Sequence, residues 1–235
     1  MWSGLIAEVE QMQQFLELFS RAWTVDYQNS GGRIHCGRGC SGCCSLAVNC
    51  SFVEALAIAR SLSEEQASRV ADHVSRLVDR TAAIEGLKEY LRMYRDEIGA
   101  CPFLDTDGAC GIYPRRPLSC RALLSTREPI WCRTDFSGLD AAEKQAYMEG
   151  LDRSVVAFPL HFVASTQETG LELETRAGRL MADLCGFSLY GNLPTLVWLA
   201  REHGLAEVSC HGRVAVEQLL TTTGSAHPCL MTMAD

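Results

Sequence analysis

Cys36-Gly-Arg-Gly-Cys40-Ser-Gly-Cys43-Cys44 is the first of two cysteine runs that decide how this chain folds. The second starts at Cys101-Pro-Phe-Leu-Asp105 and continues through Cys110-Gly-Ile-Tyr-Pro-Arg-Arg-Pro-Leu-Ser-Cys120-Arg121. Thiols spaced by two or three residues in glycine-rich loops can converge on one metal ion or cluster. Core packing follows the periods of helices and strands and does not require this spacing. The two runs therefore predict a shared metal site.

The composition is that of an ordinary globular protein of 235 residues, with 47% hydrophobic and 21% charged residues. This length suffices for one sizeable core, so we expect a single domain over residues 1–235. The formal net charge of -8 argues against a nucleic-acid partner, because binding to phosphates needs a basic surface. The sequence has no apolar run long enough to span a bilayer, so no membrane partner is expected either.

The N-terminal segment bears on how the cysteines are interpreted. It carries Glu8, Glu10 and Glu17 and lacks the basic start and apolar middle of a signal peptide. We therefore expect a cytoplasmic protein. In that reducing compartment, clustered cysteines bind metals more often than they form disulfides, which are the alternative in a secreted chain.

Apolar periodicity predicts a mainly α fold. Residues 4–23 form an expected amphipathic helix, and Ser51 with Glu54 has the pattern of a capping box for the next helix. Ser63 is expected to begin a third helix, and the tail from Thr222 is expected to be loosely ordered. Further helices are expected at about 87–98, 139–156, 175–189, 194–203 and 212–221.

The cysteine-rich region differs from this helical pattern. Prolines and glycines divide residues 101–120 into short pieces, and Asp105-Thr-Asp107-Gly108 has the composition of a hairpin tip between Cys101 and Cys110. We therefore expect a single-domain helical fold with a small irregular cysteine-rich loop and hairpin region at 36–132. The helical C-terminal half, 139–221, is expected to cover the metal region and to form a pocket against it.

Eight cysteines are the candidate metal ligands, seven from the two runs and one from Trp131-Cys132-Arg133. A structural zinc ion takes four ligands, and so does an iron–sulfur cluster. Eight thiols therefore suit two zinc ions or one cluster with spare ligands. Neighbouring cysteines seldom bind the same metal atom, which favours a second site for one of the adjacent pair. The candidates are Cys36, Cys40, Cys43, Cys44, Cys101, Cys110, Cys120 and Cys132.

Arg116 and Arg121 lie on either side of Cys120 in the sequence. Guanidinium groups bind carboxylates and phosphates, which makes the pair a candidate clamp for an anion or substrate. The alternative, which we favour, is that the arginines offset the negative charge of a thiolate site and brace its loop. His35, beside Cys36, is a further but weaker candidate ligand. The sequence shows no Ser/His/Asp set, P-loop or dinucleotide-binding glycine run.

The combined motif resembles the YkgJ-type cysteine-cluster family, described as having a CxxCxxCC zinc- or iron-chelating domain. Matching positions span residues 36–121 and include Ile112, Tyr113 and Pro117. The resemblance implies metal binding by the cysteines; members include a flagellin lysine methylase and proteins described as iron–sulfur oxidoreductases. This chain has one extra residue between Cys36 and Cys40 relative to the shortest motif. The first run also has the cysteine spacing of radical S-adenosylmethionine enzymes, but the strand–helix alternation of their barrel is missing here.

Two functional hypotheses follow. In the first, the protein is an iron–sulfur (4Fe–4S) or iron-dependent redox or group-transfer enzyme acting on a peptide, a protein or a small molecule. In the second, it is a non-catalytic zinc- or iron-chelating protein whose metal is structural or transferable. The surplus of thiols over four favours the first, with iron or an iron–sulfur cluster as cofactor and zinc as the alternative.

Overall fold

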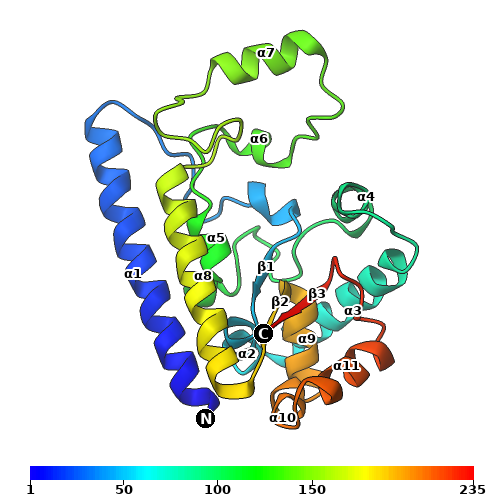
Figure 1. Ribbon diagram of the computed structural model, residues 1–235. Coiled ribbons are helices and arrows are strands. Elements are labelled where there is room, and N and C mark those ends of the chain that lie inside the picture. The colour runs from blue at the N-terminus through cyan, green and yellow to red at the C-terminus, as the bar shows by residue number, and fades with distance from the viewer.

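The computed structural model describes residues 1–235 and is mainly helical, as predicted (Figure 1). The α-helices are α1 (Trp2–Asn29), α2 (Phe52–Ala59), α3 (Glu64–Thr81), α4 (Leu87–Met93), α5 (Leu118–Ala122), α6 (Pro129–Arg133), α7 (Ala141–Glu149), α8 (Ala164–Cys185), α9 (Leu193–Glu202), α10 (Leu205–Ser209) and α11 (Arg213–Thr222). Single turns of 3-10 or π-helix are η1 (Gly42–Ser45), η2 (Tyr94–Ile98) and η3 (Tyr113–Arg115). None of the helices combines the length and apolarity that crossing a bilayer requires.

Helices α2 and α3 begin with the capping chemistry that the sequence predicts. The Ser51 hydroxyl accepts the backbone N–H of Glu54, and the Glu54 carboxylate accepts the backbone N–H of Ser51. Ser63 and Gln66 make the same reciprocal pair at the start of α3. Each box satisfies backbone donors that a helix start leaves unpaired, which fixes where the helix begins.

A small antiparallel sheet joins the segment just after the first cysteine run to the end of the chain. Its strands are β1 (Asn49–Ser51), β2 (Ser188–Asn192) and β3 (Met231–Ala234), in the order β1-β2-β3. Cys50 on β1 lies opposite Gly191 on β2, and Tyr190 lies opposite Thr232 on β3. A Cβ at Gly191 would lie 2.3 Å from the Leu230 carbonyl oxygen, so the close approach of the two strands requires glycine there.

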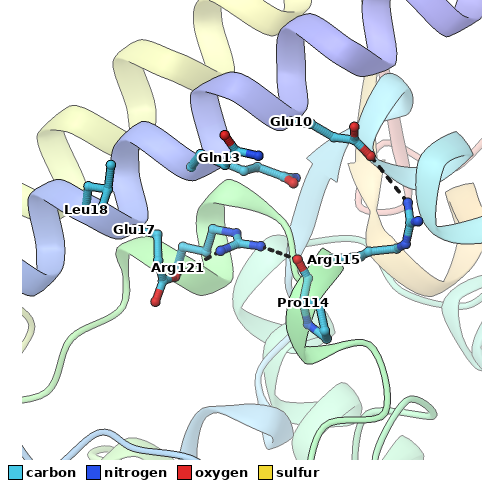
Figure 2. A pocket seen from close by; sticks show the side chains of 8 residues that line it. Glu10, Gln13, Glu17, Leu18, Pro114, Arg115 and Arg121 are labelled. Atoms are coloured by element: carbon cyan, nitrogen blue, oxygen red, sulfur yellow. Dashed lines mark hydrogen bonds and ion pairs between the residues drawn. The ribbon is translucent and has the colours of Figure 1, made fainter.

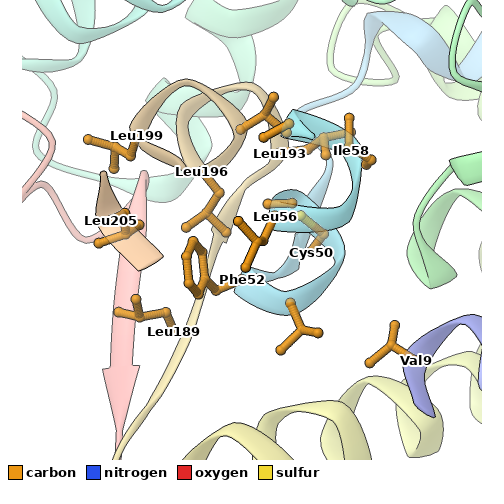
Figure 3. Packing of buried hydrophobic residues seen from close by; sticks show 14 of the residues in the cluster. Val9, Cys50, Phe52, Leu56, Ile58, Leu189, Leu193, Leu196, Leu199 and Leu205 are labelled. Carbon is orange, nitrogen blue, oxygen red and sulfur yellow. The ribbon is translucent and has the colours of Figure 1, made fainter. Parts of the chain in front are cut away.

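The main hydrophobic core joins the two halves of the chain. Phe52 and Leu56 of α2 pack with Leu193 and Leu196 of α9 (Figure 3), and all four side chains are buried. On the opposite side of the molecule, the two longest helices, α1 and α8, run side by side (Figure 1). Segments on both sides of the cysteine region therefore contribute to one continuous core.

The hairpin expected between Cys101 and Cys110 is present. Leu104 pairs with Cys110 in an antiparallel bridge, and the Asp105 N–H donates to the Ala109 carbonyl at 2.8 Å. Gly108 at the turn has φ +80°, a conformation that glycine adopts without a steric cost.

Several expectations for the C-terminal half were wrong. Helix α8 starts well before the predicted residue 175, and the predicted helix at 139–156 is confined to α7, with a looped segment following it. The tail from Thr222 is not loosely ordered, because it ends in β3 and buries Leu230 completely. A strand of four residues carries too little periodicity to be recognised, and its stability comes from backbone pairing with the distant β2.

Candidate metal centre

Seven of the eight candidate cysteines line one cavity of about 290 Å³. The structure thus brings the two runs together, although a long stretch of sequence separates them. The seven are Cys36, Cys40, Cys43, Cys44, Cys101, Cys110 and Cys120.

A backbone hydrogen bond joins the two runs directly. The N–H of Cys101 donates to the carbonyl of Cys44 at 2.8 Å. In the first run, Cys43 and Cys44 lie in the turn η1, and Gly39 adopts φ +86° just before Cys40. The turn and the left-handed glycine reverse the chain between successive cysteines, so residues close in sequence can face the same space.

Helix α1 forms the wall opposite the cysteines. Among the lining residues, Leu193 is the one contributed by the C-terminal half, so the expectation that residues 139–221 form the pocket was wrong. The reason is that α8 and α9 bury their apolar faces in the main core, which leaves the polar face of α1 beside the cysteines. Helix α1 contributes Glu17, Ser20, Arg21, Thr24 and Val25 to the lining.

Burial governs the charge state of the cavity thiols. It raises the pKa of Cys101 to about 12 and that of Cys120 well above its usual range, and neighbouring cysteines add to both shifts. A hydrogen bond with Cys44, followed by burial, raises the pKa of Cys43. These thiols are therefore protonated at neutral pH when no metal is bound. Ligation as thiolates would release protons.

The sulfur of Cys36 lies beside two backbone polar groups. It accepts the backbone N–H of Ser125 at 3.1 Å and lies 3.6 Å from the carbonyl oxygen of Leu123. Burial raises its pKa to about 11, and the Ser125 N–H opposes that rise. An N–H aimed at a cysteine sulfur is the type of contact that tunes a metal–thiolate centre.

The two candidate clamp arginines differ in how many of their donors are free. Each nitrogen of Arg121 donates a hydrogen bond. Nη1 donates to Glu17 at 2.9 Å and Nη2 to the Pro114 carbonyl at 2.7 Å (Figure 2). Nε donates to the Arg116 carbonyl at 2.8 Å. Its side chain is only 8% exposed. This geometry favours the interpretation that Arg121 braces its loop. Its bond to Glu17 attaches the second run to α1.

Arg116 acts electrostatically on the thiols, because its charge opposes the rise in the pKa of Cys110 and Cys120. Its Nη2 donates to Glu17 at 3.1 Å, and its guanidinium lies 4.1 Å from the centre of the Tyr113 ring. Its Nε is buried without a hydrogen-bond partner. Burial would raise the pKa of Glu17, but the two arginines outweigh burial and lower it, so Glu17 is ionised and holds both guanidinium groups. Arg116 is therefore the cation best placed to offset negative charge at the cysteines.

Cys132, the eighth candidate, lies outside the cavity lining and behind the first run. A Cβ at Gly42 would lie 3.2 Å from the Cys132 Cβ, so the two segments are in close contact. The Cys132 sulfur lies 3.4 Å from Nε2 of His161, whose Nδ1 is 2.8 Å from the Tyr147 hydroxyl. Burial lowers the pKa of His161 to about 4, so its ring is neutral. No motif marks His161 or Tyr147, and the sequence analysis missed both.

The other four cysteines lie away from the cavity. Cys50 is fully buried in the main core, and Cys185 packs at the edge of that core. Cys210 and Cys229 are the remaining two, and neither lines the cavity. His35 faces a different pocket, although it precedes Cys36 in sequence.

The chemistry of the donor set fits a thiophilic metal, because soft thiolates bind zinc, iron and iron–sulfur clusters. The side chains are not pre-arranged around a single ion: no three His, Cys, Asp or Glu side chains share a metal-binding geometry as they stand. Binding therefore requires the cysteine side chains to turn toward a common point.

Comparison with known families identifies this region. Residues 35–145 match a family model named CxxCxxCC, with the description "Putative zinc- or iron-chelating domain". This segment is similar to the CxxCxxCC family. The match confirms the resemblance read from the motifs, and it includes all eight candidate cysteines. No curated protein and no solved structure matches the chain.

The CxxCxxCC segment does not contain the whole cavity. Helix α1 ends at Asn29, before the matched residues begin. Glu17, which binds both Arg116 and Arg121, is therefore contributed from outside the CxxCxxCC domain. The part of the cavity wall that α1 contributes therefore lies outside the matched residues.

Proposed function

We propose that the cysteine cavity binds an iron–sulfur cluster or iron, and that the protein is a redox or group-transfer enzyme acting on a peptide, a protein or a small molecule. The observation that supports this most is the gathering of seven thiols around one cavity of about 290 Å³. Four thiolates complete a zinc site or a single cluster, so seven supply more ligands than one structural ion uses. Bound there, the group would supply electron transfer or Lewis-acid chemistry.

Access to solvent supports a functional rather than a closed structural site. Arg21, Val25 and Gly37 line the cavity and are exposed, so its rim reaches the surface. Structural metal sites are closed by four protein ligands, whereas catalytic sites keep a position that a substrate can reach. The net charge of -8 supports a partner other than nucleic acid. We also propose a cytoplasmic location, because all twelve cysteines are free and the cytosol keeps thiols reduced.

The surrounding residues would prepare the cavity for a negatively charged centre. Arg116 contributes a positive charge that opposes the burial-driven rise in the pKa of Cys110 and Cys120. The backbone N–H of Ser125 donates to the sulfur of Cys36. Glu17 holds Arg116 in position from α1. Loss of any of these contacts should change the properties of the centre without removing a ligand.

One observation favours the alternative of a non-catalytic zinc- or iron-chelating protein. The cavity lining has no histidine, and its one carboxylate, Glu17, is engaged by two arginines. General acid–base chemistry usually needs such a group free beside the substrate. In this alternative the metal stabilises the fold or passes to a partner.

Metal analysis of anaerobically purified protein tests the proposal. We expect iron and acid-labile sulfide, together with the broad visible absorbance of sulfur-to-iron charge transfer. Stoichiometric zinc without iron or sulfide, retained through anaerobic purification, would support the structural or chelating alternative instead. The same protein reconstituted with iron and sulfide should gain absorbance only if the cysteine ligands are intact.

A further inference from the structure

A second pocket, of about 380 Å³, lies beside the cysteine cavity and has a different chemistry. Its basic side chains are Arg33, His35 and Arg127, and its aromatic wall is Trp131. Glu128 is the single acidic residue in the lining, and Thr126 completes it. In a chain with a net charge of -8, this is a local excess of basic groups.

The basic groups of this pocket are not neutralised by the protein. Eleven ion pairs occur within 4.0 Å, and none involves Arg33, His35 or Arg127. The Arg127 side chain makes one hydrogen bond, from Nη1 to the Gly150 carbonyl at 3.2 Å, which leaves its other guanidinium donors free. By contrast, every nitrogen of Arg121 in the cysteine cavity has a partner. Arg127 therefore presents free guanidinium donors to the second pocket.

Aromatic rings hold Arg127 in place without consuming its donors. Its guanidinium carbon is 5.7 Å from the centre of the Trp131 ring and 6.0 Å from that of Tyr147. Trp131 and Tyr147 also pack together, with ring centres 4.8 Å apart. A guanidinium group held in this way loses little side-chain entropy when it binds an anion.

We propose that this pocket binds an oxyanion, the phosphate or carboxylate group of a small molecule, through Arg33, Arg127 and His35. Guanidinium forks match the geometry of both groups, and charge-assisted hydrogen bonds are the strong ones in such sites. Trp131 forms the apolar wall beside the anion. The proposal does not depend on the metal or the reaction proposed for the cysteine cavity.

Adjacent residues of one backbone segment line the two pockets. His35 lines the oxyanion pocket and the next residue, Cys36, lines the cysteine cavity. Ser125 connects the two sides: its carbonyl accepts the N–H of His35 at 2.9 Å, and its N–H donates to the sulfur of Cys36 at 3.1 Å. An anion bound here would thus lie on the other side of the 35–36 backbone from the candidate metal ligands.

Tryptophan fluorescence of the full chain provides the test. Inorganic phosphate and acetate would be titrated separately at constant ionic strength set with sodium chloride. We expect a saturable change that is lost in Trp131→Phe, since the other three tryptophans lie outside the pocket. Saturation with phosphate would identify a phosphate site, and saturation with acetate a carboxylate site.

Arg33→Gln with His35→Gln should weaken the binding of that probe by about tenfold or more, the loss expected for a charge-assisted hydrogen bond. Arg33 is exposed and makes no side-chain bond, so folding should survive. Arg176→Gln, which removes one positive charge from an exposed position on α8, should bind normally. A change that does not saturate with either probe, or that persists unaltered in the double variant, would overturn the proposal. Metal content measured on the same samples separates this result from any failure of the cysteine centre.

Discussion

The carboxylate of Glu54 accepts the backbone N–H of Leu118 at 2.7 Å. The same carboxylate accepts the N–H and hydroxyl of Ser51 and the side-chain amide of Gln13, at 2.9 to 3.2 Å. Glu54 is 1% exposed, so these bonds replace water around a buried charge. One side chain thus joins α1, the helix after the first cysteine run, and the helix that carries Cys120.

Glu54→Gln should destabilise the protein by about 1–3 kcal/mol for each buried donor left unsatisfied, because the amide nitrogen of glutamine cannot accept a hydrogen bond. The free energy of unfolding in urea would measure this. Glu65→Gln, at a side chain that is 85% exposed, is the control and should change stability little. Equal stability of the two variants would contradict the role assigned to Glu54.

Cys120→Ser should lower the metal content of the purified protein and its thermal stability, because ligand binding and folding are coupled. Cys120 lines the cavity, whereas Cys185 lies outside it at the end of α8. Cys185→Ser should therefore retain the metal. Equal metal content in the two variants, measured by elemental analysis, would remove Cys120 from the ligand set.

Gly42→Ala should disturb the cysteine loop. The new Cβ would lie 2.7 Å from the Pro129 carbonyl oxygen and 3.2 Å from the Cys132 Cβ, so η1 and α6 would be forced apart. Gly37→Ala, in the same loop, meets nothing within 4 Å and is the matched control. We expect a lower melting temperature and less bound metal for Gly42→Ala alone; two variants that behave alike would argue against this close contact.

Stability should fall as the pH drops from about 6.5 to about 4, partly through His73. Burial, with a smaller contribution from Arg76, lowers the pKa of His73 from 6.5 to about 4. In this window the unfolded chain binds a proton that the folded state does not, so acid favours unfolding. His73→Gln should flatten this part of the profile of unfolding free energy against pH. An unchanged slope would show that His73 is not buried in its neutral form.

A fragment ending at residue 138 should not fold. Met181 of α8 and Leu196 of α9 belong to the same core as Phe52, and all three are buried. Removing them would expose the apolar side chains of α2 to water. A soluble fragment that retains metal and the thermal stability of the full chain would instead show that the two halves are separate units.

The sequence by itself determined the local structure and the identity of the candidate metal ligands. Capping pairs such as Ser51 with Glu54 specify helix starts, because the atoms involved lie within one turn. Gly108 specifies the hairpin turn, because the turn needs a positive φ that glycine adopts without a steric cost. The spacing of the cysteines within each run and the shared motif predicted that the two runs act together, and the structure places them around one cavity.

Only the tertiary structure decided what surrounds those cysteines. Glu17 binds Arg121, which lies more than a hundred residues later in the sequence. His161, which follows α7 in the sequence, contacts the sulfur of Cys132, which precedes it. Arg33 and Arg127 are also far apart in sequence, and they line the same pocket. Helical or strand periodicity records which face of an element is apolar, but not which distant element covers it. These neighbours depend on how α1, α8 and the small sheet pack around the core, and no local sequence pattern encodes that packing.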